Sequence, residues 1–294
     1  MMDYRFKRFD DLDYEKVYRF LVELSGNDRT HINWNWARWE WMFFHPEFDR
    51  GLSDKIGLWF AGDELAGVAI YDHYLGEAFF AAKDGCEALE NEILRYMVEN
   101  LSDENGLGIA VNDSDSRTVA LLTSNGFSVH EQTENVLELS MDDLDLSIAD
   151  NGSVKISNID VEKDLYKHHE LLWKGFDHHG APSVDDDTMG RQRVMLSAPH
   201  LDPLLHIVAT NDASDYVSYC GLWYDRDTDY VYVEPVCTVP QYRNKGIAGI
   251  VLAEGLKRAY RLGARRAYVI SDMEFYKRFG FRQHSHYTFY WYKK

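Results

Sequence analysis

Residues 239–259, VPQYRNKGIAGIVLAEGLKRA, bring together groups that could hold a phosphorylated ligand. Arg243 and Lys245 supply positive charge, and the small residues Gly246 and Ala248 leave the backbone open to close approach. The apolar spacing that follows predicts a helix, whose unpaired N-terminal N–H groups and positive dipole end favour an anion. Taken alone, however, a short R-x-x-G-x-A pattern can also be a structural turn from a strand into a helix.

Two neighbouring stretches give this pattern a context. A predicted strand ending in EPVCTVP comes directly before it, and FYKRFGF, in which Tyr276 stands four residues ahead of Gly-Phe, follows about 30 residues after Gly246. In order and in separation these residues resemble the GNAT superfamily of acyl-CoA-dependent N-acyltransferases. In that family a strand ending in V-x-P leads into Q/R-x-x-G-x-G/A and a helix, and a later Tyr-x-x-x-Gly-Phe closes a short helix. The resemblance covers residues 154–294.

The resemblance implies how the chain would bind acetyl-CoA. The backbone N–H groups from about Asn244 to Ala248 would bind its pyrophosphate, with Arg243 and Lys245 assisting. The strand before them would pair its exposed backbone with the pantetheine amides, in the way that peptides add to sheet edges. The predicted cofactor-binding residues are Cys237, Thr238, Val239, Arg243, Asn244, Lys245, Gly246, Ile247 and Ala248.

The family reaction is direct attack of an amine on a thioester, and it needs two proton transfers. Tyr276 matches the family tyrosine that protonates the departing thiolate, a step that suits a phenol because it stays protonated at neutral pH. Glu234, on the strand that leads to the cofactor, is the candidate base for the amine proton, directly or through water. The alternative for Tyr276 is an aromatic side chain packed in the core. The alternative for Glu234 is a carboxylate that faces the surface. Cys237 would lie beside the thioester, but we interpret it as a small apolar filler rather than a nucleophile.

Apolar periodicity and turn residues predict the same element order in both halves of the chain, β-α-α-β-β-β-α-β-α-β. An acidic, polar stretch at about residues 143–155 predicts a linker between the halves. We therefore predict an α/β (α+β) protein with two tandem GNAT acyl-CoA N-acyltransferase folds, in each of which helices flank a mixed, mostly antiparallel sheet. The predicted domains are residues 1–145 and 153–294, and the second is the GNAT domain that binds acetyl-CoA.

The first half departs from the family pattern at both motifs. The stretch before its third predicted helix lacks R-x-x-G-x-G/A, and Leu122 stands where the tyrosine would be. Carboxylates near that helix start would interact with the helix dipole themselves and repel phosphates. They are Asp84, Glu87, Glu90 and Glu92. We therefore expect residues 1–145 to be a degenerate GNAT-like domain that lacks the pyrophosphate loop and has a structural role, including walling the acceptor pocket.

Charge is divided unevenly along the chain. The net charge is −18, yet residues 240–294 hold 12 basic against 3 acidic side chains, whereas residues 1–150 hold 12 against 31. Chance clustering on solvated helix faces is one explanation. The other is an anion site in the tail, with acidic surface elsewhere that attracts a cationic substrate. A nucleic-acid-binding protein would carry the opposite overall sign, which argues against that class.

Composition indicates the compartment. A hydrophobic content of 45% and a charged content of 27% are ordinary for a globular protein, and 294 residues suffice for about two domains. Cys86, Cys220 and Cys237 fit neither a disulfide framework nor a zinc spacing, which favours a reducing cytoplasm. The N-terminal stretch has no apolar signal region, and no stretch is long enough to span a membrane. We expect a cytoplasmic protein.

The histidine-rich stretch HHELLWKGFDHHG, residues 168–180, and the acidic run at 185–187 are further candidates. Four histidines and three aspartates could hold a metal. Adjacent histidines point in different directions on a helix, however, and the expected chemistry needs no metal. The family places its acceptor-binding loop in this region, so His178, His179 and the acidic run are candidate acceptor contacts, with a solvated loop as the alternative.

The tryptophan-rich segment HINWNWARWEWMFF, residues 31–44, could stack on a ligand or pack inside the fold. Its tryptophans alternate with polar residues at helical spacing, as on an amphipathic helix. This alternation favours a packing face. We therefore expect an amphipathic packing face, which could line an interface, rather than a ligand-stacking site.

Together these observations predict a cytoplasmic acetyl-CoA-dependent N-acetyltransferase without a metal and without a nucleic-acid or membrane partner. The acceptor is expected to be a small-molecule or peptide amine, and a cationic one because the first half is acidic. The chain is expected to be a monomer or a homodimer. One alternative is a GNAT-fold protein that senses acyl-CoA without turning it over. Another is an acyltransferase with a longer acyl or an aminoacyl donor.

Overall fold

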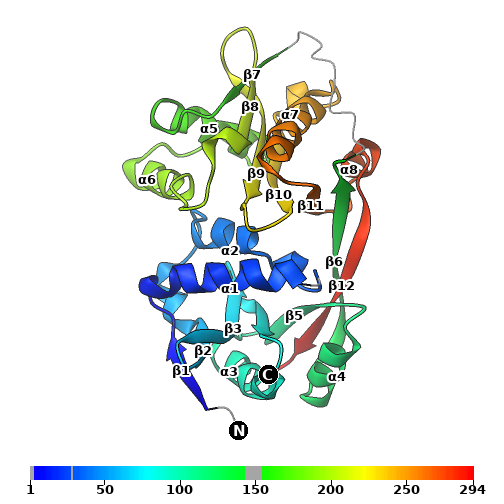
Figure 1. Ribbon diagram of the computed structural model, residues 1–294. Coiled ribbons are helices and arrows are strands. Elements are labelled where there is room, and N and C mark those ends of the chain that lie inside the picture. Colours follow the sequence, from blue (N-terminus) through cyan, green and yellow to red (C-terminus); the bar gives the residue numbers. More distant parts are fainter. Residues whose placement is uncertain (1–2, 28, 143–153) are drawn as a thin grey trace. The chain divides into compact units, whose positions relative to one another are not determined.

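A computed structural model describes residues 3–27, 29–142 and 154–294 (Figure 1). Within them, helices and strands follow the predicted order in both halves. The first half contains β1 (Tyr4–Arg8), α1 (Tyr14–Asn27), α2 (Trp36–Phe43), β2 (Gly57–Ala61), β3 (Glu64–Asp72), β4 (Tyr74–Ala82), α3 (Glu90–Asn100), β5 (Leu107–Asn112), α4 (Ser116–Ser124) and β6 (Ser128–Ser140). The second half contains β7 (Lys155–Asn158), α5 (Val161–Gly175), α6 (Asp186–Met195), β8 (His206–Thr210), β9 (Tyr216–Tyr224), β10 (Tyr230–Thr238), α7 (Ile247–Leu262), β11 (Arg266–Ile270), α8 (Glu274–Phe279) and β12 (Arg282–Tyr292). Most of the predicted linker, residues 143–153, lies outside the described residues.

The chain forms two compact units that do not coincide with its two halves. The first unit lies within Met1–Phe43, Glu47–Val136 and Gln283–Lys294, and the second within Phe44–Pro46 and Leu137–Arg282. The end of β6, from Leu137 onward, therefore belongs to the second unit, and β12, from Gln283 onward, belongs to the first. These units differ from the predicted division into residues 1–145 and 153–294. The reason is that periodicity identifies a strand but does not identify the strand it pairs with.

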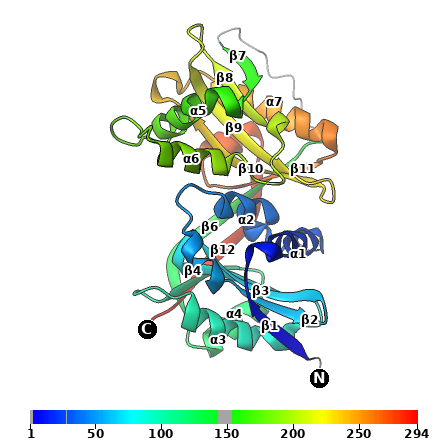
Figure 2. The ribbon, with the colours of Figure 1, turned by 90° about the vertical axis from the view of Figure 1, so that its left-hand side faces the viewer.

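The sheet of the second unit has the strand order β6-β11-β10-β9-β8-β7. β10 and β11 run parallel, whereas β9 pairs antiparallel with both β10 and β8, and β8 with β7. Figures 1 and 2 show α7 on one face of this sheet and α5 with α6 on the other. Because side chains alternate along a strand, β9 serves two cores: Cys220 and Leu222 pack on the α7 side and Tyr219 on the α5 side. The sheet is thus mixed and mostly antiparallel, as predicted.

The sheet of the first unit has the order β1-β2-β3-β4-β5-β12. β4 and β5 are parallel and meet at Glu77 and Gly108, and the other neighbouring pairs are antiparallel. Residues 287–292 of β12 pair with residues 107–112 of β5. Both α1 and α3 contact β3, which is buried along most of its length. The first unit therefore also has helices packed on a mixed sheet.

The contact between β12 and β5 depends on two glycines. At Gly106, where φ is +121°, a Cβ would collide with the carbonyl oxygen of Tyr292. At Gly108 a Cβ would lie 2.6 Å from the indole of Trp291. Only glycine admits the end of the chain this closely, so the C-terminal strand is an integral part of the first unit.

The tryptophan-rich segment lies in the interior of the first unit. Trp36 and Trp39 are fully buried and Trp34 is nearly so. The Trp39 ring packs against Phe9 and Tyr14, with ring centres 5.8 and 5.7 Å away. This confirms the prediction of a packing face. Among the described residues, no helix is both long and apolar enough to cross a membrane.

Candidate functional site

The sheet of the second unit opens at the C-terminal part of β10. Pairing with β11 ends at Tyr232, opposite Tyr268, whereas β10 continues to Thr238 alongside β9. A register shift against β9 marks a bulge in between. Residues 233–238 therefore present an edge that β11 does not pair, where an extended ligand with amide groups can form hydrogen bonds.

The segment after β10 turns sharply before it enters α7. Asn244, with φ of 60°, and Gly246, with φ of 79°, both have left-handed backbone conformations, which asparagine tolerates and glycine adopts without strain. Gly246 directly precedes the helix, and among the described residues no side chain caps the first turn of α7. The N–H groups of that turn are thus available to an anion, which the helix dipole also attracts.

A cavity of about 530 Å³ joins the open edge of β10 to the start of α7. This volume is within the range of about 300–1,000 Å³ that is usual for small-molecule sites. It is lined by Gly175, Phe176, Asp177, Val236, Cys237, Thr238, Tyr242, Arg243, Asn244, Gly246, Ile247, Ala248, Gly249, Met273, Phe275 and Tyr276. Most of the predicted site residues therefore line this one cavity. Three of them do not: Glu234, Val239 and Lys245.

Tyr276 enters this cavity from α8. Only 6% of the residue is exposed, and its ring packs against Phe275 and Phe281 with ring centres 5.0 and 5.5 Å away. Burial, together with smaller electrostatic contributions from Cys220 and Glu234, raises the pKa of Tyr276 well above its ordinary value. The side chain therefore stays a phenol at neutral pH, which is the form that can donate a proton.

Glu234 is half-buried and does not line the cavity. Its carbonyl oxygen accepts a hydrogen bond of 2.8 Å from Nε1 of Trp223, which holds the backbone at the bulge. Its charge is one of the smaller contributions that raise the pKa of Tyr276, after burial.

The three predicted strand residues differ in their surroundings. Cys237 is 5% exposed, and burial raises the pKa of its thiol to about 12, so it is not a thiolate nucleophile at neutral pH. The Thr238 hydroxyl shares a hydrogen bond of 2.8 Å with Ser218 Oγ. Val239 packs in the core on the α5 side, and its N–H donates to the carbonyl oxygen of Val217. The side chain and the backbone N–H of Val239 therefore both contact other parts of the protein.

The two predicted cations have different partners. Arg243 Nε donates to the carbonyl oxygen of Thr238 at 2.9 Å, and Nη2 donates to that of Gly175 at 2.9 Å. Nη2 also lies 2.9 Å from Oδ2 of Asp177. Lys245 is exposed, with Nζ 4.9 Å from the ring centre of Tyr242. The guanidinium therefore bonds acceptor groups of the protein itself. Its predicted role as a phosphate ligand did not include these bonds.

The sequence analysis did not identify the part of the wall that α5 provides. Gly175, Phe176 and Asp177 lie at the C-terminal end of α5 and line the cavity. A Cβ on residue 175 would lie 2.7 Å from Sγ of Cys237, so this glycine lets α5 approach β10. The glycine in WKGFD was the available signal, but a glycine there also fits an ordinary helix end.

The histidine-rich stretch divides between two environments. His178 stacks on Trp173 with ring centres 4.7 Å apart, whereas His168 is fully buried with its ring centre 4.7 Å from that of Tyr219. Asp185 accepts backbone hydrogen bonds as the N-cap of α6. In the part of the chain that the structure describes, no group of His, Cys, Asp and Glu could hold a metal ion. Contacts between this loop and an acceptor stay a prediction.

At the corresponding place in the first unit, carboxylates surround the helix start. Glu87 accepts a backbone N–H hydrogen bond of 3.0 Å, Glu90 forms an ion pair with Arg117, and Leu122 is fully buried. A polar cavity of about 290 Å³ is lined by residues that include Asp84 and Glu90. Negative groups thus stand where the second unit presents N–H groups, an arrangement that disfavours a phosphate.

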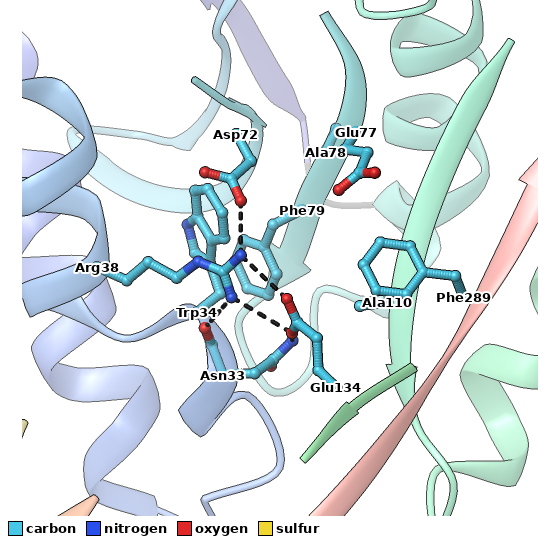
Figure 3. Close-up of a pocket in the computed structure, with 10 residues that line it drawn as sticks. All are labelled: Asn33, Trp34, Arg38, Asp72, Glu77, Ala78, Phe79, Ala110, Glu134 and Phe289. Carbon is cyan, nitrogen blue, oxygen red and sulfur yellow. Dashed lines mark hydrogen bonds and ion pairs between the residues drawn. The ribbon is translucent and has the colours of Figure 1, made fainter. Parts of the chain in front are cut away.

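A smaller cavity of the first unit, about 20 Å³, contains a charged cluster (Figure 3). Arg38 Nη2 lies 2.6 Å from Oδ2 of Asp72 and 3.1 Å from Oε1 of Glu134, and the guanidinium lies over the ring of Trp34. Although burial opposes ionisation, the Arg38 charge holds the pKa of Asp72 well below its ordinary value. The three charged groups satisfy one another, and the space suits about one water molecule. We interpret the cluster as structural.

Comparison with known proteins gives a family-model match for part of the chain and a fold for nearly all of it. Residues 165–281 match the model of the acetyltransferase (GNAT) family. Among curated proteins, none matches the chain. Solved structures match over nearly its whole length, and the identity is low enough that they show a shared fold alone.

Three of these solved structures are informative. A tandem GNAT protein from the clavulanic acid biosynthesis pathway is 13% identical, with a TM-score of 0.65, over 99% of this chain and 98% of that chain. A GCN5-related N-acetyltransferase from Sphaerobacter thermophilus is 17% identical, with a TM-score of 0.61, over 99% and 95%. The N-myristoyltransferase of Saccharomyces cerevisiae is 10% identical, with a TM-score of 0.58, over 100% and 80%. The tandem match confirms the prediction of two tandem GNAT folds.

Proposed function

The chain carries a domain of the acetyltransferase (GNAT) family at residues 165–281, and from this premise we propose that it transfers an acetyl group from acetyl-CoA to a primary amine. Family membership supports the general reaction, which is acyl transfer from an acyl-CoA to an amine. Our proposal goes beyond family membership in two respects. It specifies acetyl as the transferred group, and it specifies the amine as a small molecule or a peptide.

One observation carries the proposal: the first turn of α7, which no described side chain caps, and the edge of β10 that does not pair with β11 meet in a single cavity. An acyl-CoA needs both features, because its pyrophosphate is an anion and its pantetheine arm carries amides in an extended chain. In the proposed complex, N–H groups from Asn244 to Ala248 bind the pyrophosphate and Lys245 adds positive charge. The edge of residues 233–238 pairs with the pantetheine amides, and Cys237 lies beside the thioester.

The proposed reaction is a direct transfer. The amine nitrogen attacks the thioester carbonyl carbon, a C–N bond forms, the C–S bond breaks, and the sulfur leaves as a thiolate. Tyr276 protonates the thiolate, and the proton lost by the amine passes through water to Glu234. The high pKa of the Cys237 thiol fits this route, because no acyl-enzyme intermediate is formed.

The proposed acceptor is cationic. Residues 1–150 hold 31 acidic against 12 basic side chains, and such a field attracts an ammonium ion. The ammonium must then lose a proton before its nitrogen can attack, which gives Glu234 its proposed role. We assign the reaction to the cytoplasm, where the three cysteines, all of them free and buried, stay reduced.

Binding is tested first, by calorimetry with acetyl-CoA and by mass spectrometry of the intact complex. We expect one acetyl-CoA for each chain, and absence of binding at high micromolar acetyl-CoA contradicts the proposal. Turnover is then tested by a screen of amines for release of the CoA thiol, with polyamines, aminoglycosides and peptide amines included. The mass of the product separates acetyl transfer from transfer of a longer acyl or an aminoacyl group.

A second candidate function is binding of acyl-CoA without turnover, as in a sensor. It is favoured by the position of Glu234, which does not line the cavity. Tight binding of acetyl-CoA with no thiol release for any amine in the screen would support this candidate over the enzyme.

A further inference from the structure

Arg243 joins two segments of the second unit that lie far apart in sequence, the end of α5 and the segment between β10 and α7. Its guanidinium bonds the carbonyl oxygen of Thr238 at the end of β10, the carbonyl oxygen of Gly175 at the end of α5, and the carboxylate of Asp177. All four of these residues line the acyl-CoA cavity. We call this set of contacts the Arg243 clasp.

The clasp suits the chemistry of its partners. Gly175 is the last residue of α5, and the final carbonyl groups of a helix have no acceptor role inside it. A guanidinium there satisfies such a carbonyl and complements the negative end of the helix dipole. Its planar, five-donor fork can serve two carbonyls and a carboxylate together, which a lysine ammonium cannot match in geometry.

The clasp stands at the start of an ordered loop. Residues 176–185 form the loop between α5 and α6. Asp177 lies near its start and has a left-handed backbone, with φ of 60°. This loop folds back on α5: Trp173 Nε1 donates to the carbonyl oxygen of Gly180 at 3.0 Å, and His169 Nε2 lies 3.1 Å from that of Ser183. The Arg243 clasp therefore connects this loop to the segment that leads into α7.

We propose that Arg243 is a positioning residue and not a phosphate ligand: it couples residues 176–185 to the loop that contains Asn244 and Gly246, so that acyl-CoA binding orders residues 176–185. Arg243 belongs to the loop that contains Asn244 and Gly246, so any adjustment of that loop to the pyrophosphate moves the guanidinium and its partner Asp177. The coupling between acyl-CoA binding and residues 176–185 rests on the proposed function. The claim that Arg243 holds these residues in place without ligand does not.

The test uses two variants that keep the fold. Arg243→Gln introduces the other residue of the Q/R-x-x-G-x-G/A pattern, and Asp177→Asn removes only the charge, because asparagine tolerates the left-handed backbone. Lys245→Gln is the matched control, since it removes a positive charge from the same loop without touching the clasp. Hydrogen exchange of residues 176–185 is measured with and without acetyl-CoA, and affinities are measured for CoA and for pantetheine, which lacks the pyrophosphate.

Without ligand, we expect exchange in residues 176–185 to be roughly tenfold faster in Arg243→Gln and in Asp177→Asn than in the wild type or Lys245→Gln. Acetyl-CoA should slow this exchange in the wild type and the control but not in the two clasp variants, although their affinity for CoA changes by less than about threefold. The ratio of CoA to pantetheine affinity should be the same in Arg243→Gln as in the wild type.

Two results would overturn the proposal. A loss of CoA affinity of roughly tenfold in Arg243→Gln, with pantetheine affinity unchanged, would make Arg243 a phosphate ligand. Wild-type exchange in the ligand-free variants would show that Arg243 does not hold the loop. If the wild type binds no acetyl-CoA, the proposed function and the coupling fail together, while the ligand-free exchange still decides whether Arg243 positions the loop.

Discussion

At the cavity of the second unit, Tyr276 and Gly246 act through different properties. Tyr276 contributes a single hydroxyl group, held in place by the aromatic rings of Phe275 and Phe281. Gly246 contributes no side chain but a backbone conformation, with φ of 79°. Substitutions at the two positions should therefore have separable effects, one on turnover and the other on folding and cofactor binding.

Tyr276→Phe should reduce acetyl transfer by a factor of about 10²–10⁴, the usual contribution of a positioned acid. Affinity for acetyl-CoA should stay within about threefold, because the ring and its packing remain. Turnover is measured by thiol release with an amine from the screen, and affinity by calorimetry. Tyr260→Phe, on α7 and outside the cavity wall, is the control. Equal turnover in wild type and Tyr276→Phe would remove Tyr276 from the mechanism.

Gly246→Ala should destabilise the second unit by about 1–2 kcal/mol, the cost of a left-handed backbone for a residue with a Cβ. A Cβ there meets no atom within 4 Å, so strain and not a clash is the cause. Gly249→Ala is the matched control: it also meets open space, but it lies inside α7, where alanine stabilises a helix by about 1 kcal/mol. Urea unfolding should give opposite signs for the two variants, and equal signs would contradict this account.

At the scale of elements, the sheet of each unit is completed by a strand from a distant part of the chain. β12 pairs with β5, and residues 137–140 at the end of β6 take their place beside β11. Leu137 and Leu139 are buried in the core of the second unit. Removing either strand would expose a sheet edge and part of a core, so we expect neither half of the chain to fold alone as its predicted range.

Gly106→Ala should destabilise the first unit more than Gly62→Ala does. Both glycines have positive φ, so both variants carry strain of about 1–2 kcal/mol. A Cβ at residue 62 meets nothing within 4 Å, whereas at residue 106 it collides with the backbone of Tyr292 in β12. Tryptophan fluorescence during urea unfolding is a suitable probe, because six of the eight tryptophans lie in the first unit. Equal losses in the two variants would contradict the packing of β12 against residue 106.

At the scale of the whole molecule, buried titratable groups make stability depend on pH. His168 and His206 are at most 1% exposed, and burial lowers the pKa of each to about 3 from 6.5. His206 Nδ1 is bonded to the Tyr219 hydroxyl, whereas both ring nitrogens of His168 are without a partner among the described residues. Both rings are therefore buried as neutral imidazoles at physiological pH.

Acidification should destabilise the protein between pH 6.5 and about 3. In that window the unfolded chain binds protons at these histidines that the folded chain excludes, so the free energy of unfolding falls as the pH falls. From pH 7.5 to 5.0 each histidine accounts for about 2 kcal/mol. His168→Phe should reduce the pH-dependent loss by that amount in urea unfolding, whereas the exposed His179→Phe should not. An unchanged loss in His168→Phe would show that this ring is not excluded from protonation.

Element order and the turn into α7 could be predicted because both depend on neighbouring residues. Apolar periodicity is read over one helix or strand, and Gly246 follows the strand and precedes the helix within a few residues of chain. The partners of Arg243 could not be predicted in this way, because Gly175 lies 68 residues away. Glu234 was predicted from its place on the strand, but it lies within the bulge of β10 and does not line the cavity.

By itself the sequence determined the order of helices and strands, the presence of a glycine at the turn into α7, and the absence of the phosphate-binding pattern from the first half. Each of these follows from local backbone preference and from the side chains of a short segment. Only the tertiary structure decided that β12 completes the sheet of the first unit, that α5 closes the cavity wall at Gly175, and that Arg243 bonds that helix end. These depend on which distant surfaces pack together, and many segments share the apolar and hydrogen-bonding character that such packing requires.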